Sequence, residues 1–252
     1  MEDHINVAIR VRPLNQREQR TVSSTVQASL PWSIQRDTIT QRAYADGRMV
    51  SNGNSFTFVD KVFDQKDTTQ RVYDDIVKNI ISSSMGGFNG TIFAYGQTSS
   101  GKTHTMHGSG QEPGIIKLAV QEIFDTVKND TKREYLIRVS FLEIYNEVLR
   151  DLLEPTKCNL KIHENAKREI FVGDLSEHIV FNAEHVEEIL QKGDRNRHIA
   201  GTNMNERSSR SHTIFRIVIE SREKADSEED GDKGKLAKQQ QQQQRLSTGS
   251  LA

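Results

Sequence analysis

Residues 91–106 read TIFAYGQTSSGKTHTM, and this stretch decides the fold. The run from Thr91 to Tyr95 is apolar almost throughout, which is typical of a central strand covered on both faces in a parallel α/β sheet. The strand is expected to end at Gly96, and a helix is expected to begin just after Gly101. Because glycines let the backbone curl around an anion and a helix start offers free N–H groups, the turn between them is expected to bind phosphate.

The turn spells G-x-x-x-x-G-K-T, the phosphate-loop pattern. In this pattern the lysine, Lys102, is placed for the β and γ phosphates, and the hydroxyl of Thr103 is placed for a magnesium ion. The residues predicted to hold the phosphates are Gly96, Gln97, Thr98, Ser99, Ser100, Gly101, Lys102 and Thr103. Small-molecule kinases and GTPases use the same loop, but a GTPase should also carry N-K-x-D, which we do not find in the sequence.

Strands and helices are expected to alternate around this loop, which predicts an α/β fold. Period-two or apolar runs predict strands at 5–11, 55–63, 91–95, 134–145 and 213–220. Helical spacing of apolar residues predicts helices at 68–84, after Pro113-Gly114, and at about 183–192 with Asn182 as the cap. Residues 221–252 are highly charged and include six consecutive glutamines, so we expect a disordered loop or tail after a core of residues 1–220.

Composition and charge exclude several classes of protein. With 34 basic and 35 acidic residues, the chain is not expected to coat nucleic acid. The single cysteine, Cys158, cannot form an internal disulfide, and no apolar run is long enough to span a membrane. A soluble intracellular protein with no nucleic-acid or membrane partner is therefore expected.

Two further stretches have ambiguous meanings when read alone. RVRP, residues 10–13, could simply be a strand end facing solvent, and NERSSRSH, residues 205–212, could be a flexible basic loop or a phosphorylation site. Together with the phosphate loop and EIYNE, residues 143–147, they follow one order and spacing. In that combination the chain resembles the kinesin motor domain over about residues 4–224.

The resemblance implies a P-loop NTPase of kinesin type, with a central mostly parallel sheet flanked by helices and incomplete at its C-terminus. It implies that Arg10, Arg12 and Pro13 lie against the adenine of ATP, with His104 as an aromatic neighbour of the base. It also implies that Ser208 and Ser209 face the γ-phosphate and magnesium, and that Arg210 pairs with a glutamate of a second switch. The implied catalytic residues are Ser208, Ser209 and Arg210, the implied magnesium ligands are Thr103 and Ser209, and the implied cofactors are ATP and Mg.

The resemblance further implies a microtubule-stimulated ATPase that moves along microtubules. Tubulin contacts are expected around Lys161, Lys167 and Arg168, in LKIHENAKRE; the alternative for this stretch is an ordinary solvated hairpin. The full-length protein is expected to be a homodimer with a coiled coil, in the cytoplasm on the cytoskeleton. The sequence MNERSSRSHTIFR and the SREK that follows it are most similar to the centromere-associated CENP-E-like class. This similarity implies a mitotic role at the spindle and kinetochore.

One departure from the family pattern limits these expectations. The D-x-x-G-x-E of the second switch does not occur in the 252 residues. We therefore expect the chain to be a fragment of a complete motor, with weak or absent ATP turnover by itself. The alternative is a degenerate nucleotide-binding protein that acts as a non-motile microtubule-associated or scaffold protein.

Overall fold

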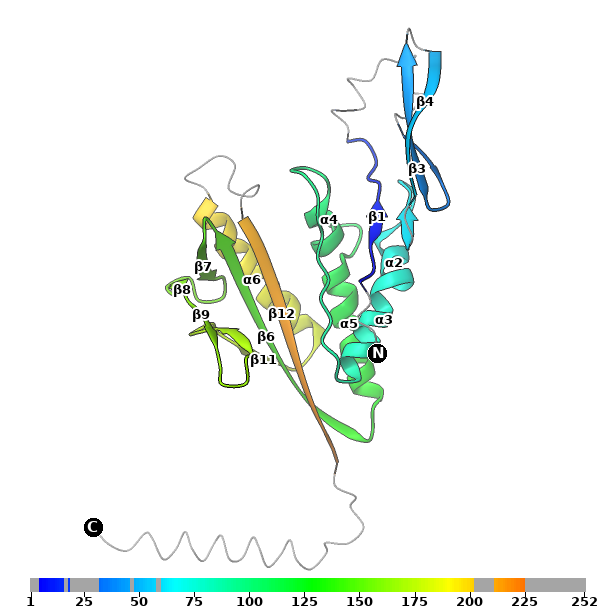
Figure 1. Cartoon of the computed structure of the whole chain (residues 1–252). Coiled ribbons are helices and arrows are strands. Elements are labelled where there is room, and N and C mark those ends of the chain that lie inside the picture. Colours follow the sequence, from blue (N-terminus) through cyan, green and yellow to red (C-terminus); the bar gives the residue numbers. More distant parts are fainter. Residues whose placement is uncertain are drawn as a thin grey trace, which may run out of the picture.

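The computed structural model describes residues 5–15, 18, 32–45, 48–57, 60–201 and 211–224. Figure 1 shows two groups of elements, one around a short N-terminal strand and one around a long two-stranded ribbon. In the first group, β1 (Ala8–Arg10) pairs in parallel with β5 (Lys61–Phe63). The antiparallel strands β2 (Trp32–Gln35), β3 (Thr38–Ala45) and β4 (Arg48–Thr57) extend away from this group (Figure 1). The single strand predicted at 55–63 is therefore two strands, since β4 ends at Thr57 and β5 begins at Lys61.

The helix predicted at 68–84 is confirmed, with one irregular turn. It consists of α2 (Thr69–Val72), a π-helical turn η1 (Tyr73–Val77) and α3 (Lys78–Met85). The inserted π turn keeps the apolar side chains of Val72, Val77 and Ile81 buried along one side. The chain leaves the helix at Gly86-Gly87, where Gly87 adopts a φ of 98° that suits glycine.

The second group is built on β6 (Arg133–Tyr145), which pairs antiparallel along its whole length with β12 (Ser211–Glu223). Helix α5 (Ile115–Asn129) confirms the helix predicted after Pro113-Gly114. Helix α6 (Ala183–Gly201) begins where it was predicted but runs nine residues beyond the expected end at 192. The backbone N–H of His185 donates to Asn182 Oδ1 at 2.8 Å, so Asn182 caps α6 as expected. Strand β12 runs three residues beyond the predicted boundary at 220, and residues 225–252 lie outside the described part of the chain.

The expected parallel pairing holds only for β1 and β5 among the described ladders. The residues at the β6 to β7 turn, Asn146 and Glu147, have φ values of 50° and 61°, as in a tight hairpin that reverses the chain. Strand β7 (Val148–Asp151) therefore runs antiparallel to β6, and β8 (Cys158–Leu160) and β11 (His178–Val180) complete an antiparallel sheet. Strands β9 (Ile162–Glu164) and β10 (Ile170–Val172) form a separate antiparallel hairpin.

The prediction of a central strand at Thr91–Tyr95 is wrong. No strand in the described part of the chain pairs with this segment. The segment is irregular, and its side chains alternate between more and less exposed positions. Ile92 packs against the core, whereas Phe93 is 78% exposed and Tyr95 is 96% exposed. Only one face of the segment Thr91–Tyr95 therefore packs against the core, and the other face is exposed.

The hydrophobic core joins the first helix (α2, η1 and α3) and β5 to α5, β6, β11 and α6, and partly buried residues of β12 pack against it. The rings of Phe141 on β6 and Phe215 on β12 meet edge to face, with centroids 5.6 Å apart. Helix α6 approaches this pair at Gly193, where a Cβ atom would lie 2.3 Å from Cδ1 of Phe141. A glycine in the helix is therefore required for close packing. In the described part of the chain, no helix is long and apolar enough to cross a membrane.

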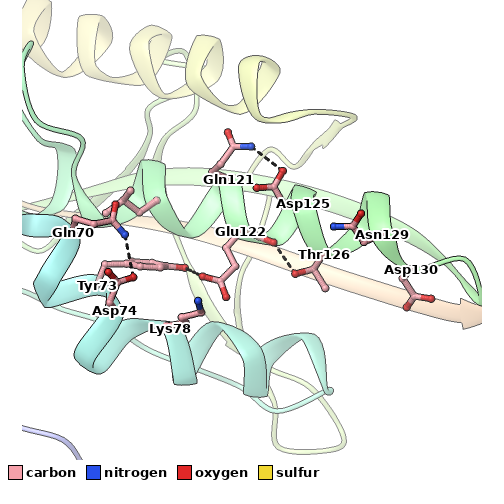
Figure 2. Close-up of a pocket in the computed structure, with 11 residues that line it drawn as sticks. Gln70, Tyr73, Asp74, Lys78, Gln121, Glu122, Asp125, Thr126, Asn129 and Asp130 are labelled. Atoms are coloured by element: carbon pink, nitrogen blue, oxygen red, sulfur yellow. Dashed lines mark hydrogen bonds between the residues drawn. The ribbon is translucent and has the colours of Figure 1, made fainter.

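The helices η1 and α5 are joined by a buried phenol. Figure 2 shows Tyr73 reaching across to Glu122, and the hydroxyl donates to Glu122 Oε2 at 2.6 Å. Burial, followed by the hydrogen bond and charge of Glu122, raises the pKa of Tyr73 above its ordinary value. The contact lies at an open hollow of about 710 Å³ between these helices.

We expect Gly193→Ala to destabilise the fold although alanine favours helices by about 1 kcal/mol over glycine. The added methyl group would overlap the ring of Phe141, and such overpacking costs about 1–3 kcal/mol. Urea unfolding should show a lower free energy of unfolding. The control Gly110→Ala places its methyl group where no atom lies within 4 Å, and it should leave stability unchanged. A Gly193→Ala protein as stable as wild type would contradict this packing.

The raised pKa of Tyr73 predicts a loss of stability at alkaline pH. The folded state favours the neutral phenol. The contribution of Tyr73 to the free energy of unfolding is therefore complete below about pH 10, the pKa of an unfolded tyrosine, and is lost as the pH rises further. Tyr73→Phe should lose about 1 kcal/mol at pH 7 through the missing hydrogen bond, but show a shallower decline between about pH 10 and 12. Urea unfolding across this range measures both effects. Tyr95→Phe, at an exposed position, should retain the wild-type slope.

Candidate functional site

The phosphate loop has a backbone shape that its glycines make possible. Gly96 and Gly101 have φ values of 155° and 100°, and a Cβ atom on Gly96 would lie only 2.5 Å from the hydroxyl oxygen of Ser100. Ser99 is also left-handed, with a φ of 64°. Such a conformation is costly for a residue with a side chain, and it is typical of functional loops.

The lysine and threonine of the loop lie at the start of α4 (Lys102–His107). Lys102 Nζ donates to the carbonyl oxygens of Gly96 at 2.7 Å and Gln97 at 2.8 Å, so its ammonium group lies over the loop backbone. Thr103 is exposed in the first helical turn, where backbone N–H groups lack helical acceptors. A cation beside free N–H groups suits a phosphate, and an exposed hydroxyl suits a hard cation such as Mg²⁺.

The arginines of RVRP lie beside this loop, although they come from the first strand. Arg10 Nη1 donates to Thr105 Oγ1 on α4 at 3.0 Å. The side chain of Arg12 passes Gly101, since a Cβ atom there would lie 3.8 Å from Cδ of Arg12. Arg12 also donates to both carboxylate oxygens of Glu18, at 2.7 and 2.6 Å, and to the carbonyl oxygen of Pro13 at 3.0 Å. The hydrogen bond from Arg12 and the backbone N–H of Asn15 lower the pKa of Glu18 to about 2.

A glutamate that the sequence analysis did not single out connects these groups. Glu112 lies 3.9 Å from Arg10 through Oε1 and 3.9 Å from His104 Nε2 through Oε2. His104 is half-exposed at the edge of the loop. No pattern in the sequence pointed to Glu112, because its partners come from other parts of the chain.

The predicted catalytic residues Ser208, Ser209 and Arg210 lie outside the described residues. The chain on both sides of them is held in place. Arg197 near the end of α6 donates from Nη2 to Ser211 Oγ, the first residue of β12, at 3.0 Å. Its Nε atom also lies 3.7 Å from Oε1 of Glu143, a fully buried carboxylate in EIYNE. The residues before and after the segment 202–210 are thus tied to each other and to β6.

Helix α6 is also tied to the phosphate-loop region. Asp194 Oδ2 lies 3.3 Å from His107 Nδ1 at the end of α4, and Glu187 pairs with Lys117 of α5 at 3.0 Å. The hollow in Figure 2 is a separate feature and does not suit a triphosphate. Its lining carries four carboxylates and one lysine, which would repel phosphate. The charged lining residues are Asp74, Lys78, Glu122, Asp125 and Asp130.

The phosphate loop and the arginines of β1 thus lie side by side in the structure, and comparisons with known proteins identify the family of the chain. The kinesin motor domain family model matches residues 10–241. Over 227 residues the chain is 47% identical to kinesin-like protein KIN-7O of Arabidopsis thaliana, covering 90% of this chain. It is 45% identical over 227 residues to centromere-associated protein E of Homo sapiens, covering 89% of this chain.

These relatives are much longer proteins, since the matched part is 16% and 8% of their lengths. A solved structure of a fast kinesin, described with implications for ATPase mechanism and interactions with microtubules, matches with a TM-score of 0.76 at 36% identity. The match covers 86% of this chain and 60% of that chain. The kinesin-type α/β fold and the resemblance to the CENP-E-like class are thereby confirmed. The chain belongs to the kinesin motor domain family.

Proposed function

We propose that this chain is the ATP-binding part of a microtubule motor. The observation that carries the proposal is the phosphate loop, with Lys102 at its backbone carbonyls and the arginines of β1 beside it. Membership of the kinesin family supports ATP as the nucleotide and the microtubule as the track.

In this proposal, the loop residues 96–103 hold the triphosphate of Mg-ATP, and Lys102 turns its ammonium group from the loop carbonyls toward the β and γ phosphates. Thr103, together with Ser209, holds the magnesium ion, which offsets the negative charge of the phosphates. Arg10, Arg12, Pro13 and His104 surround the base. The placement of Arg10 against α4 supports this assignment, because it brings the first strand to the phosphate loop.

Hydrolysis is assigned to Ser208, Ser209 and Arg210, which would orient the attacking water beside the γ-phosphate. The contacts of Arg197 support the assignment, because they tie α6 to the first residue of β12, and these are the two elements that flank the three residues in the sequence. The 252-residue polypeptide carries no D-x-x-G-x-E partner for Arg210. We therefore expect it to bind ATP but to turn it over slowly, even with microtubules present.

The hairpin of β9 and β10 is proposed as a microtubule contact. Lys161, Lys167 and Arg168 are exposed in or beside it. Ile162 and Ile170 are 60% and 75% exposed, so the hairpin presents apolar as well as basic groups. Such a mixture suits a protein surface of negative charge.

For the longer protein we propose a homodimer that acts on the cytoskeleton in the cytoplasm, with a mitotic role at the spindle and kinetochore. The similarity to centromere-associated protein E supports the mitotic assignment.

Lys102→Ala is expected to weaken ATP binding at least about tenfold, since a charge-assisted phosphate contact is lost. Thr103→Ala should instead reduce the gain in affinity that Mg²⁺ provides. Titration with a fluorescent ATP analogue, with and without Mg²⁺, measures both. Lys117→Ala removes a lysine from an exposed ion pair on α5 and should bind as wild type does. A wild-type chain that fails to bind ATP would sink the proposal.

Reversing the charges in the hairpin, with Lys167→Glu and Arg168→Glu together, should lower microtubule affinity several-fold, and more strongly at low salt. Co-sedimentation with microtubules at two salt concentrations measures this. Lys128→Glu changes an exposed lysine on α5 and serves as the control. If the hairpin variant and the control sediment alike, the hairpin does not contact the microtubule.

A further inference from the structure

Glu112 lies where three elements of the candidate nucleotide site meet. Its Oε1 atom accepts a hydrogen bond from the backbone N–H of Thr69, the first residue of α2. The same oxygen lies 3.9 Å from Nη2 of Arg10, at the end of β1. Its second oxygen lies 3.9 Å from Nε2 of His104, on α4. One carboxylate thus faces two of the four residues that are proposed to surround the adenine, Arg10 and His104.

The loop that carries Glu112 is closed tightly, so the position of the carboxylate is defined. Gly108 and Pro113 form an isolated β-bridge, and the N–H of Ser109 donates to the carbonyl oxygen of Glu112 at 2.8 Å. Gly108 has a φ of 88°, and a Cβ atom there would lie 2.4 Å from that carbonyl oxygen. Gly114 is equally confined, since a Cβ atom would lie 2.3 Å from the carbonyl carbon of His107.

The carboxylate is kept charged by these neighbours. The backbone N–H of Thr69 has the largest effect in lowering the pKa of Glu112, and the charge of Arg10 adds to it. The side chains of Arg10 and Glu112 are 19% and 30% exposed, so solvent screens their attraction only in part. At 3.9 Å the contacts of Glu112 to Arg10 and His104 are too long for hydrogen bonds. Arg10 donates from Nη1 to Thr105 Oγ1 instead.

We propose that Glu112 is a positioning residue for base recognition, holding Arg10 and His104 in place while it makes no contact with the phosphates. The inference rests on the proposed adenine site. The loop 108–114, which lies outside the phosphate-loop pattern, would then contribute to recognition of the base.

The test compares ATP with inorganic tripolyphosphate, which has phosphates but no base. Glu112→Gln keeps an oxygen acceptor for Thr69 and removes the charge that faces Arg10 and His104. We expect about fivefold weaker ATP binding, the size of losing a partly exposed ionic contact, with unchanged tripolyphosphate binding. Glu187→Gln, which removes a carboxylate from the exposed pair with Lys117, is the matched control and should change neither affinity.

A double-mutant cycle separates positioning from a structural effect. In a chain that already carries Arg10→Ala and His104→Ala, Glu112→Gln should cause no further loss of ATP affinity. Equal weakening of ATP and tripolyphosphate, or the same loss in both backgrounds, would show that Glu112 only stabilises the fold, and would overturn the inference. Wild-type ATP affinity in Glu112→Gln would overturn it as well. If the wild-type chain binds tripolyphosphate but shows no preference for ATP, the adenine site itself is wrong.

Discussion

The antiparallel ladder between β6 and β12 is the constraint on which the second half of the structure depends. It pairs Tyr145 with Ser211 at one end and Arg133 with Glu223 at the other. Helix α6 can lie close to this ribbon only because Gly193 leaves room for the ring of Phe141. That approach brings Arg197 to Ser211 and to the buried carboxylate of Glu143. The ladder therefore fixes the start of β12 at Ser211 beside α6, on the C-terminal side of the segment proposed for hydrolysis.

The features that the sequence predicted well are those set by nearby residues. The turn from Gly96 to Thr103 depends on glycine backbone freedom within eight positions, so its pattern was readable without tertiary information. The helices at 68–84 and after Gly114, and strands β6 and β12, follow from hydrophobic periodicity. The cap at Asn182 follows from the preference of its side chain for a free backbone N–H. The roles of the residues around the base and at the γ-phosphate came from the family resemblance and stay proposals.

The errors concern contacts between distant parts of the chain. The apolar composition of Thr91–Tyr95 suggested a buried strand, but composition alone does not show whether another strand pairs with the segment. The turn at Asn146 and Glu147 makes β7 antiparallel to β6, and the separate return of β12 makes the ladder between β6 and β12 antiparallel. Glu112 was missed because Arg10 and Thr69, which give it a role, come together only in the fold. The π turn η1 was not predicted because the segment was interpreted with a regular helical period, whereas the buried Val72 and Val77 lie five positions apart.

The irregular segment Thr91–Tyr95 has a consequence for the behaviour of the chain in solution. It is apolar and lies with Phe93 and Tyr95 largely exposed, directly before the phosphate loop. Large apolar side chains exposed close together favour association with other molecules. A molecule that bound to Phe93 and Tyr95 would cover the segment that leads into Gly96. Phe93 and Tyr95 thus affect both the solubility of the chain and the approach of a nucleotide to the phosphate loop. A substitution made at either position to improve solubility also changes the entrance to that loop.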